Sequence, residues 1–263
     1  MKKLNLWLLA SLFVAAFTLS ACGDDDDSPS VPPADVPDGT IPAVNDLIGT
    51  WTVNSTDESY TFTFTQAELT CKTKSGVNYQ GSYTLKDGVL SYGGHEYKPA
   101  LLKNKSVLVF KVLVKDGEGK EYEELAMILF KKGASVSTSS DELQGKWHWY
   151  MFGDTQYIRA GWKFDGNKFE LVITPWGEKY VGTYTYSHGI VNLKVTAAYT
   201  SREPHTGYGF GEGSLDPSTL EATWNVLDED HWHIDAADEG PFIVNGAEAY
   251  GCVANLMCLY HKK

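Results

Sequence analysis

The 263-residue chain has 34 Asp and Glu residues against 22 Lys and Arg, a formal net charge of −12, and 43% of its residues are hydrophobic. An acidic chain of this kind disfavours binding to nucleic acid and direct docking on anionic lipid, because both ligands carry negative charge. The hydrophobic fraction is ample for a packed core, and the roughly 220 residues that follow the N-terminal region fit one or two domains.

The first 21 residues have the parts of a secretory signal. Lys2 and Lys3 give a basic start, an apolar stretch runs from Leu4 to Leu19, and small residues precede Cys22. The stretch is shorter than the roughly 20 residues that cross a bilayer. Leu-Ser-Ala-Cys at 19–22 resembles the lipobox of bacterial lipoproteins. The resemblance implies a signal peptide at 1–21 and a diacylglycerol anchor on Cys22. The alternative is a soluble secreted protein with an unmodified cysteine.

Residues 22–45 are predicted to form an acidic, proline-rich tether. Asp24 to Asp27 with Ser28 resemble the acidic export signal that follows the lipidated cysteine in surface lipoproteins of Bacteroidetes. This resemblance implies a position on the outer membrane, facing outward, with the membrane as partner through the lipid. Residues 28–45 hold five of the ten prolines, so they behave as a semi-rigid spacer. The alternative is a solvated charge run with no role in export.

Two copies of one unit follow, at 46–133 and 143–263, joined by a polar linker at 134–142. Leu-Ile-Gly-Thr-Trp at 47–51 returns as Leu-Gln-Gly-Lys-Trp at 143–147. Gly-Ser-Tyr and Gly-Thr-Tyr occur later in each copy, and both copies end in an apolar stretch followed by lysines. A repeat of this kind predicts two structural units.

Each copy is predicted to consist of β-strands. Tyr60 to Thr65 alternates large and small residues with the period of a half-buried strand, and no long segment outside the signal peptide has a helical period. Short strands separated by hairpin turns predict antiparallel meanders that close into barrels. The further expected strands are 48–54, 68–74, 79–86, 106–115 and 121–131 in the first copy, and 145–151, 157–164, 167–174, 178–186, 189–198, 206–215, 219–227 and 249–261 in the second.

An early Gly-x-Trp, a meander of short strands and a basic residue at the last strand resemble the lipocalin-like (calycin-like) domains of Bacteroidetes lipoproteins. The resemblance implies two tandem up-and-down barrels. It also implies that each tryptophan closes one end of its barrel under a lysine of the last strand: Trp51 with Lys131 or Lys132, and Trp147 with Lys262 or Lys263. A cation over an indole contributes about 0.5–2 kcal/mol.

Six of the eight tryptophans lie in the second copy. Aromatic concavities suit apolar ligands, and flat rings suit sugars. Trp147 and Trp224 are interpreted as core residues. The residues expected at the rim of a ligand pocket are Trp149, Trp162, Trp176, Tyr208 and Trp232. The alternative for all of them is core packing.

Residues 228–235, Asp-Glu-Asp-His-Trp-His-Ile-Asp, are the densest polar stretch. On a strand, His231 and His233 would share a face and could bind zinc, with Asp235 or His205 as a further ligand. The carboxylates could instead bind calcium. The alternative is a polar hairpin.

The glycine-rich segment from Ser201 to Gly211 is predicted to be a loop at the barrel mouth, where binding residues are expected. Cys71, Cys252 and Cys258 are expected to be unpaired, with the last two on one extended strand and too far apart for a disulfide.

No catalytic motif is found. The sequence therefore favours a non-enzymatic, surface-exposed binding lipoprotein without a cofactor, whose second barrel takes a small apolar ligand or a glycan. Two alternatives remain: an accessory lipoprotein that acts by protein contacts, and a hydrolase that uses carboxylates and histidines of the second copy.

Overall fold

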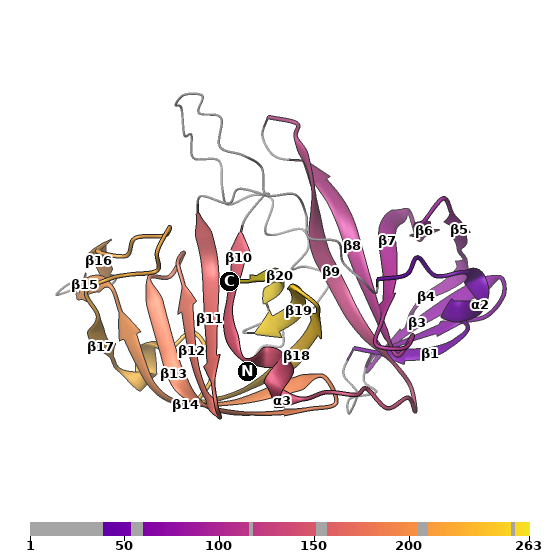
Figure 1. Cartoon of the computed structure of the whole chain (residues 1–263). Coiled ribbons are helices and arrows are strands. Elements are labelled where there is room, and N and C mark those ends of the chain that lie inside the picture. Colours follow the sequence, from indigo (N-terminus) through magenta and orange to yellow (C-terminus); the bar gives the residue numbers. More distant parts are fainter. Residues whose placement is uncertain (1–38, 54–59, 116–117, 151–156, 205–209, 254–255) are drawn as a thin grey trace.

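The structure is a computed structural model that describes residues 39–53, 60–115, 118–150, 157–204, 210–253 and 256–263. Within these residues the fold is all-β, with two four-residue α-helices and one short 3-10 helix. None of the helices in the described part is long and apolar enough to cross a membrane. Figure 1 shows the two halves of the chain side by side, each built around its own antiparallel sheet.

The first half forms a nine-stranded sheet in the order β4-β3-β2-β1-β9-β8-β7-β6-β5. Its two outermost strands, β4 and β5, are consecutive in the chain and are separated only by Tyr83. The elements of this half are α2 (Val44–Leu47), β1 (Gly49–Thr52), β2 (Thr61–Phe64), β3 (Glu68–Thr73), β4 (Gly76–Ser82), β5 (Thr84–Lys86), β6 (Val89–Tyr92), β7 (His95–Leu102), β8 (Val107–Lys115) and β9 (Glu121–Lys131).

The second half is a closed barrel of eight antiparallel strands. Strands β10 to β14 and β18 to β20 form the wall, and the circle is complete because β10 pairs with β20 while β13 pairs with β14. The elements are α3 (Ser140–Leu143), β10 (Gly145–Tyr150), β11 (Ile158–Asp165), β12 (Lys168–Ile173), β13 (Glu178–Ser187), β14 (Ile190–Thr200), β15 (Arg202–Pro204), β16 (Phe210–Gly213), β17 (Asn225–Leu227), η1 (Glu229–His231), β18 (Ala237–Asn245), β19 (Glu248–Val253) and β20 (Leu256–Lys262).

The alternation of residue types in the sequence sets which face of each strand is buried. On β2, Phe62 and Phe64 are buried while the intervening threonines are partly exposed. Pro99 lies within β7, where its missing N–H would normally cost a ladder hydrogen bond. Leu101, two residues later, exchanges both backbone hydrogen bonds with Thr40 on the side away from β8. The backbone nitrogen of Pro99 points to that same side, away from β8. Its missing N–H therefore costs no hydrogen bond in the pairing of β7 with β8.

A third hydrophobic cluster joins the two halves. It contains ten buried residues from both: Leu102, Val107, Val109, Leu125, Ile128, Phe130, Val136, Ile190, Ile243 and Tyr250. Val107 to Phe110 on β8 are all buried, because one face of the strand packs into the first half and the other into this cluster. Lys103 and Glu142 add an ion pair of 2.7 Å between the first half and α3. The two halves therefore share a core.

The segments before and between the two halves belong to the fold. Thr40 bridges to Leu101, and Val44 packs against the first core, so ordered structure starts before residue 46. In the linker at 134–142, Val136 is buried in the shared cluster, and Ser139 caps α3 by accepting a hydrogen bond from the backbone N–H of Asp141. The linker is thus packed between the two halves.

The structure contains strands that the sequence analysis did not predict, namely β6, β7, β15 and β18. Of these, β15 lies in the glycine-rich segment that was expected to be a loop, and it pairs with β16. The single strand expected over 249–261 is wrong, because β19 and β20 form a hairpin there. Cys252 and Cys258 therefore lie on neighbouring strands, where Cys258 is paired with Gly251 and Cys252 with Met257. Both cysteines are free, as is Cys71, and burial raises the pKa of Cys71 to about 12.

Candidate ligand-binding site

The tryptophan of the first strand has the same surroundings in each half. Trp51 and Trp147 are fully buried, and each donates its Nε1–H to the carbonyl oxygen four residues earlier at 2.7 Å. Lys131 Nζ lies 5.4 Å from the ring centre of Trp51, and Lys262 Nζ lies 5.2 Å from that of Trp147. The first and last strands of each half also pair directly. The opposite, open end of the second barrel is the place to look for a ligand.

Aromatic rings fill the interior of the second barrel. Trp162 is 1% exposed and stacks on Phe164 at 5.2 Å, while Phe242 meets it edge-on at 5.9 Å and stacks on Tyr260 at 5.4 Å. Ring pairs at these separations stabilise a core beyond the area that they bury. The interpretation of Trp162 as a rim residue is therefore corrected. Its position on β11 points it inward, together with Ala160 and Phe164.

The other aromatic candidates lie nearer the open end. Trp149, Trp176 and Trp232 are half-buried and pack against the barrel core. Tyr208 lies outside the described residues. Trp224, interpreted from the sequence as a core residue, is instead half-buried on the outside, with Lys179 Nζ 4.7 Å from its ring centre.

A buried carboxyl group organises the open end. Glu178 begins β13 and is 2% exposed. Its Oε2 accepts a very short hydrogen bond from the Tyr180 hydroxyl, and its Oε1 lies 2.7 Å from His233 Nδ1. The backbone N–H of His233 donates to the Tyr180 hydroxyl at 2.9 Å, and Trp176 stacks on the imidazole at 4.9 Å. These contacts fix the segment after η1 across the end of the barrel.

Burial raises the pKa of Glu178, because a carboxylate is poorly solvated there. The hydrogen bond from Tyr180 and the neighbouring His233 offset part of this effect. Burial also raises the pKa of Tyr180, and its bond to Glu178 adds to the rise. Tyr180 therefore stays protonated and acts as the donor in this pair.

The described residues do not assemble the metal site that the sequence suggested at 228–235. Residues 229–231 form a 3-10 helix, so His231 and His233 do not share the face of a strand. His233 pairs with Glu178, and the His231 ring meets Phe210 at 6.0 Å. No three His, Cys, Asp or Glu side chains of the described part come together in a group that could hold a metal ion. Asp235 is exposed, and His205 lies outside the described residues.

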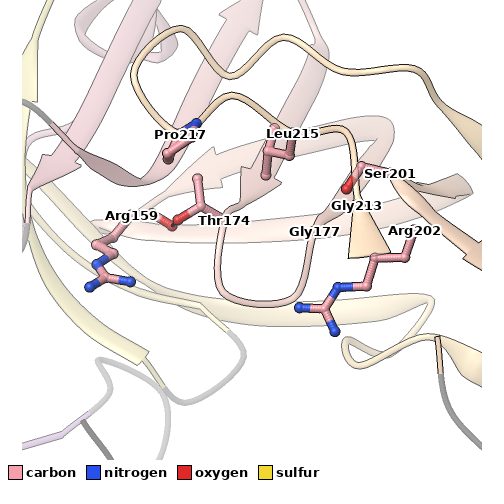
Figure 2. Close-up of a pocket in the computed structure, with 8 residues that line it drawn as sticks. All are labelled: Arg159, Thr174, Gly177, Ser201, Arg202, Gly213, Leu215 and Pro217. Atoms are coloured by element: carbon pink, nitrogen blue, oxygen red, sulfur yellow. Dashed lines mark hydrogen bonds between the residues drawn. The ribbon is translucent and has the colours of Figure 1, made fainter. Parts of the chain in front are cut away.

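A pocket of about 310 Å³ lies beside this cluster, at the rim of the barrel. Figure 2 labels the residues that line it: Arg159, Thr174, Gly177, Ser201, Arg202, Gly213, Leu215 and Pro217. They come from the start of β11, the turn between β12 and β13, the β14–β15 junction, and the end of β16 with the segment that follows it. Its volume is at the lower end of the range for small-molecule sites, about 300–1,000 Å³.

Hydrogen bonds hold the pocket walls in place. The Thr174 hydroxyl and backbone N–H both donate to the carbonyl oxygen of Arg159 at 2.9 Å. Arg202 Nη2 donates to the carbonyl oxygen of Pro175 at 2.8 Å, and the Ser201 N–H donates to that of Gly177 at 2.7 Å. The walls are therefore tied together before any ligand arrives.

Ser201 places a hydroxyl between two glycines. Its side-chain oxygen is buried and has no hydrogen-bond partner. A Cβ on Gly177 would lie 2.7 Å from this oxygen, and one on Gly213 would lie 3.0 Å from it. Gly177 also has φ +66°, a conformation that other residues rarely adopt. Both positions therefore need glycine for the hydroxyl to fit.

A second hollow, of about 400 Å³, lies on the outer face of strands β11 to β14. Its charged lining residues carry both signs: Lys163, Asp165, Lys168 and Glu170. None of its lining residues has a buried side-chain polar atom without a partner. The rim pocket is therefore the better candidate.

The sequence located only part of this site. Ser201 and Arg202 fall in the glycine-rich segment that was expected at the barrel mouth. Arg159 and Glu178 had no local signal, because neither belongs to a recognisable motif. The distances that make them a group arise from the pairing of β11 with β12 and of β13 with β14.

No protein-family model matches the chain, and no curated protein matches it significantly.

Proposed function

We propose that the chain is a non-enzymatic binding lipoprotein of the cell surface, and that its ligand docks in the rim pocket of the second barrel. The observation that carries this proposal is the contrast between the packed interior of that barrel and the preformed pocket at its open end. A ligand has no room beside Trp162 and Phe242, whereas the rim offers a volume of about 310 Å³.

A glycan fits the pocket better than an apolar ligand. Arginine, serine and threonine side chains provide much of the lining, and Leu215 and Pro217 provide its apolar part. Sugars present hydroxyl groups together with an apolar ring face, which matches such a mixture. An apolar ligand would leave the polar atoms of the lining without partners, at a cost of about 1–3 kcal/mol for each.

The first half is proposed to be a barrel of the same type. Residues 76–86 would then be one wall strand bent at Tyr83, whose first part pairs with β3 and whose second part pairs with β6. In the second half β13 fills the same place, between β12 and β14. The matching tryptophan closures support this equivalence.

The membrane anchor is proposed from the sequence, since Cys22 and the aspartates at 24–27 lie outside the described residues. Cys22→Ala should release the chain from the membrane fraction, because the variant lacks the lipidated thiol. Protease treatment of intact cells would test surface exposure. Membrane retention of the Cys22→Ala variant would argue against the anchor.

Binding can be tested with the full chain on a glycan array, compared with a variant in which the pocket is filled. Leu215→Trp should abolish binding, because the larger side chain occupies the pocket. Leu113→Trp is the matched control, since Leu113 is 51% exposed on β8 and far from the pocket in the fold. Absence of any glycan hit, or equal binding by both variants, would refute the proposed site.

No observation favours the hydrolase. Its mechanism needs two carboxyl groups facing each other across the substrate. Among the described residues, Glu178 is the one Asp or Glu that is buried, and it is already paired with Tyr180 and His233.

A further inference from the structure

The rim pocket has a positive lining in an acidic protein. Its eight lining residues include Arg159 and Arg202 and no Asp or Glu, although acidic residues outnumber basic ones by 34 to 22 in the chain. Figure 2 shows the two arginines on either side of the turn that contains Thr174 and Gly177. The chain as a whole is acidic, so a pocket lined by two guanidinium groups and no carboxyl group differs in charge from the rest of the protein.

The charge of Arg202 is not consumed by an ion pair. Within the described part of the chain, no carboxylate oxygen lies within 4.0 Å of its guanidinium, which donates one hydrogen bond to the carbonyl oxygen of Pro175. Arg202 does interact electrostatically with Glu178, but the two oxygens of that carboxyl group are already bonded to Tyr180 and His233. A guanidinium has five N–H groups, so most of the donors of Arg202 remain for a ligand.

Ser201 supplies a third, neutral donor. Ser201 lines the pocket, and the residue is only 4% exposed. Its hydroxyl is buried but has no hydrogen-bond partner. A buried hydroxyl without a partner costs about 1–3 kcal/mol. Two glycines keep the space around it open, at the positions where a Cβ would crowd it. An oxygen of a bound ligand would satisfy this hydroxyl.

We propose that the rim pocket binds the anionic group of an acidic sugar, a carboxylate or a sulfate ester, between Arg159, Arg202 and the Ser201 hydroxyl. This inference rests on the proposed glycan-binding function and names its substrate class. Planar guanidinium groups bind oxyanions through paired, charge-assisted hydrogen bonds, which are stronger than bonds to neutral hydroxyls. A pocket of about 310 Å³ has room for one sugar unit that carries the charge.

The test is isothermal titration calorimetry on the full chain carrying Cys22→Ala, with three trisaccharides as probes. Trigalacturonate supplies carboxylates, 6-sulfated galactotriose supplies sulfate esters, and galactotriose is the neutral reference. At least one acidic probe should bind about tenfold or more tightly than galactotriose, with an affinity that falls as salt rises. The arm that binds identifies the anionic group.

Variants assign the binding to the pocket. Arg202→Gln should weaken binding of the acidic probe about tenfold or more and leave galactotriose unaffected, while Arg202→Lys should recover part of the loss. Lys163→Gln is the matched control, because it removes one positive charge from the outer face of β11, the strand that also carries Arg159. It should leave the affinity unchanged. If Arg202→Gln also lowers the urea midpoint of unfolding, its loss of binding could come from lost stability. Arg159→Gln then decides whether the arginines of the pocket bind the acidic probe.

The outcomes separate this inference from the proposed function. Equal affinity for neutral and acidic probes, blocked by Leu215→Trp, would overturn the acidic-sugar inference and retain glycan binding. Preference for an acidic probe that both arginine variants leave intact would also overturn it. Failure of all three probes, together with an empty glycan array, would overturn both proposals.

Discussion

Ile243→Ala tests whether the two halves share a core. Ile243 lies on β18 of the second half, is fully buried and belongs to the cluster that contains Phe130 of the first half. A Cβ on Gly189 would lie 2.5 Å from Ile243 and 2.9 Å from Phe130, which places all three residues in one contact region. The substitution therefore opens a cavity where the two halves meet.

The magnitude follows from the atoms removed. The variant loses three carbon atoms, worth about 0.8 kcal/mol each, and leaves a cavity, so the whole chain should lose about 2–5 kcal/mol. Part of the packing of Ile243 lies within its own half. The first half should therefore lose about 1–3 kcal/mol of stability, which raises the population of its open form roughly 5- to 150-fold.

Native-state hydrogen exchange resolved by peptide measures both effects. Slow amides in β8 and β9 should exchange faster in Ile243→Ala, although the substitution lies in the other half. Ile173→Ala is the matched control, since Ile173 is 2% exposed but belongs to the core of the second half alone. It should speed exchange in the second barrel only. Unchanged protection of β8 and β9 in Ile243→Ala would refute the shared core.

Three further predictions concern the second barrel. The pKa of Glu178 is raised in the folded protein, so over a range of pH the folded protein holds a proton that the unfolded chain releases. The free energy of unfolding should therefore fall as pH rises above about 4.5. Urea unfolding from pH 4 to 8 should show this slope in wild type and lack this contribution in Glu178→Gln. Burial, with Lys263 and Lys146 adding to it, lowers the pKa of His148 to about 4. The stability that the neutral His148 contributes is fully present above pH 6.5 and is lost as pH falls toward 4. It should amount to on the order of 1–2 kcal/mol, because the ring is partly exposed. A His148→Gln variant whose stability follows the same pH profile as wild type would contradict this. Lys262→Met keeps the apolar stem over Trp147 but removes the cation, so it should cost about 0.5–2 kcal/mol. Lys146→Met is the control, because Lys146 is exposed on β10, and it should change the stability by no more than about 0.5 kcal/mol.

The sequence by itself determined the all-β class, most of the strands and the matching tryptophans of the two halves. The alternation at 60–65 gave β2 its buried face, and the repeated Gly-x-Trp put Trp51 and Trp147 at matching positions on the first strand of each half. These features are local or periodic, and a strand's period of two fixes which side chains share a face.

Only the tertiary structure decided which of those faces meets another part of the chain. Trp162 and Val136 have ordinary surroundings in the sequence, yet one fills the barrel and the other lies in the core shared by the halves. Arg159 and Arg202 line the same pocket at the rim, although 42 residues lie between them in the sequence. Burial and charge clustering depend on contacts between strands that are distant in sequence, and no local pattern encodes those contacts.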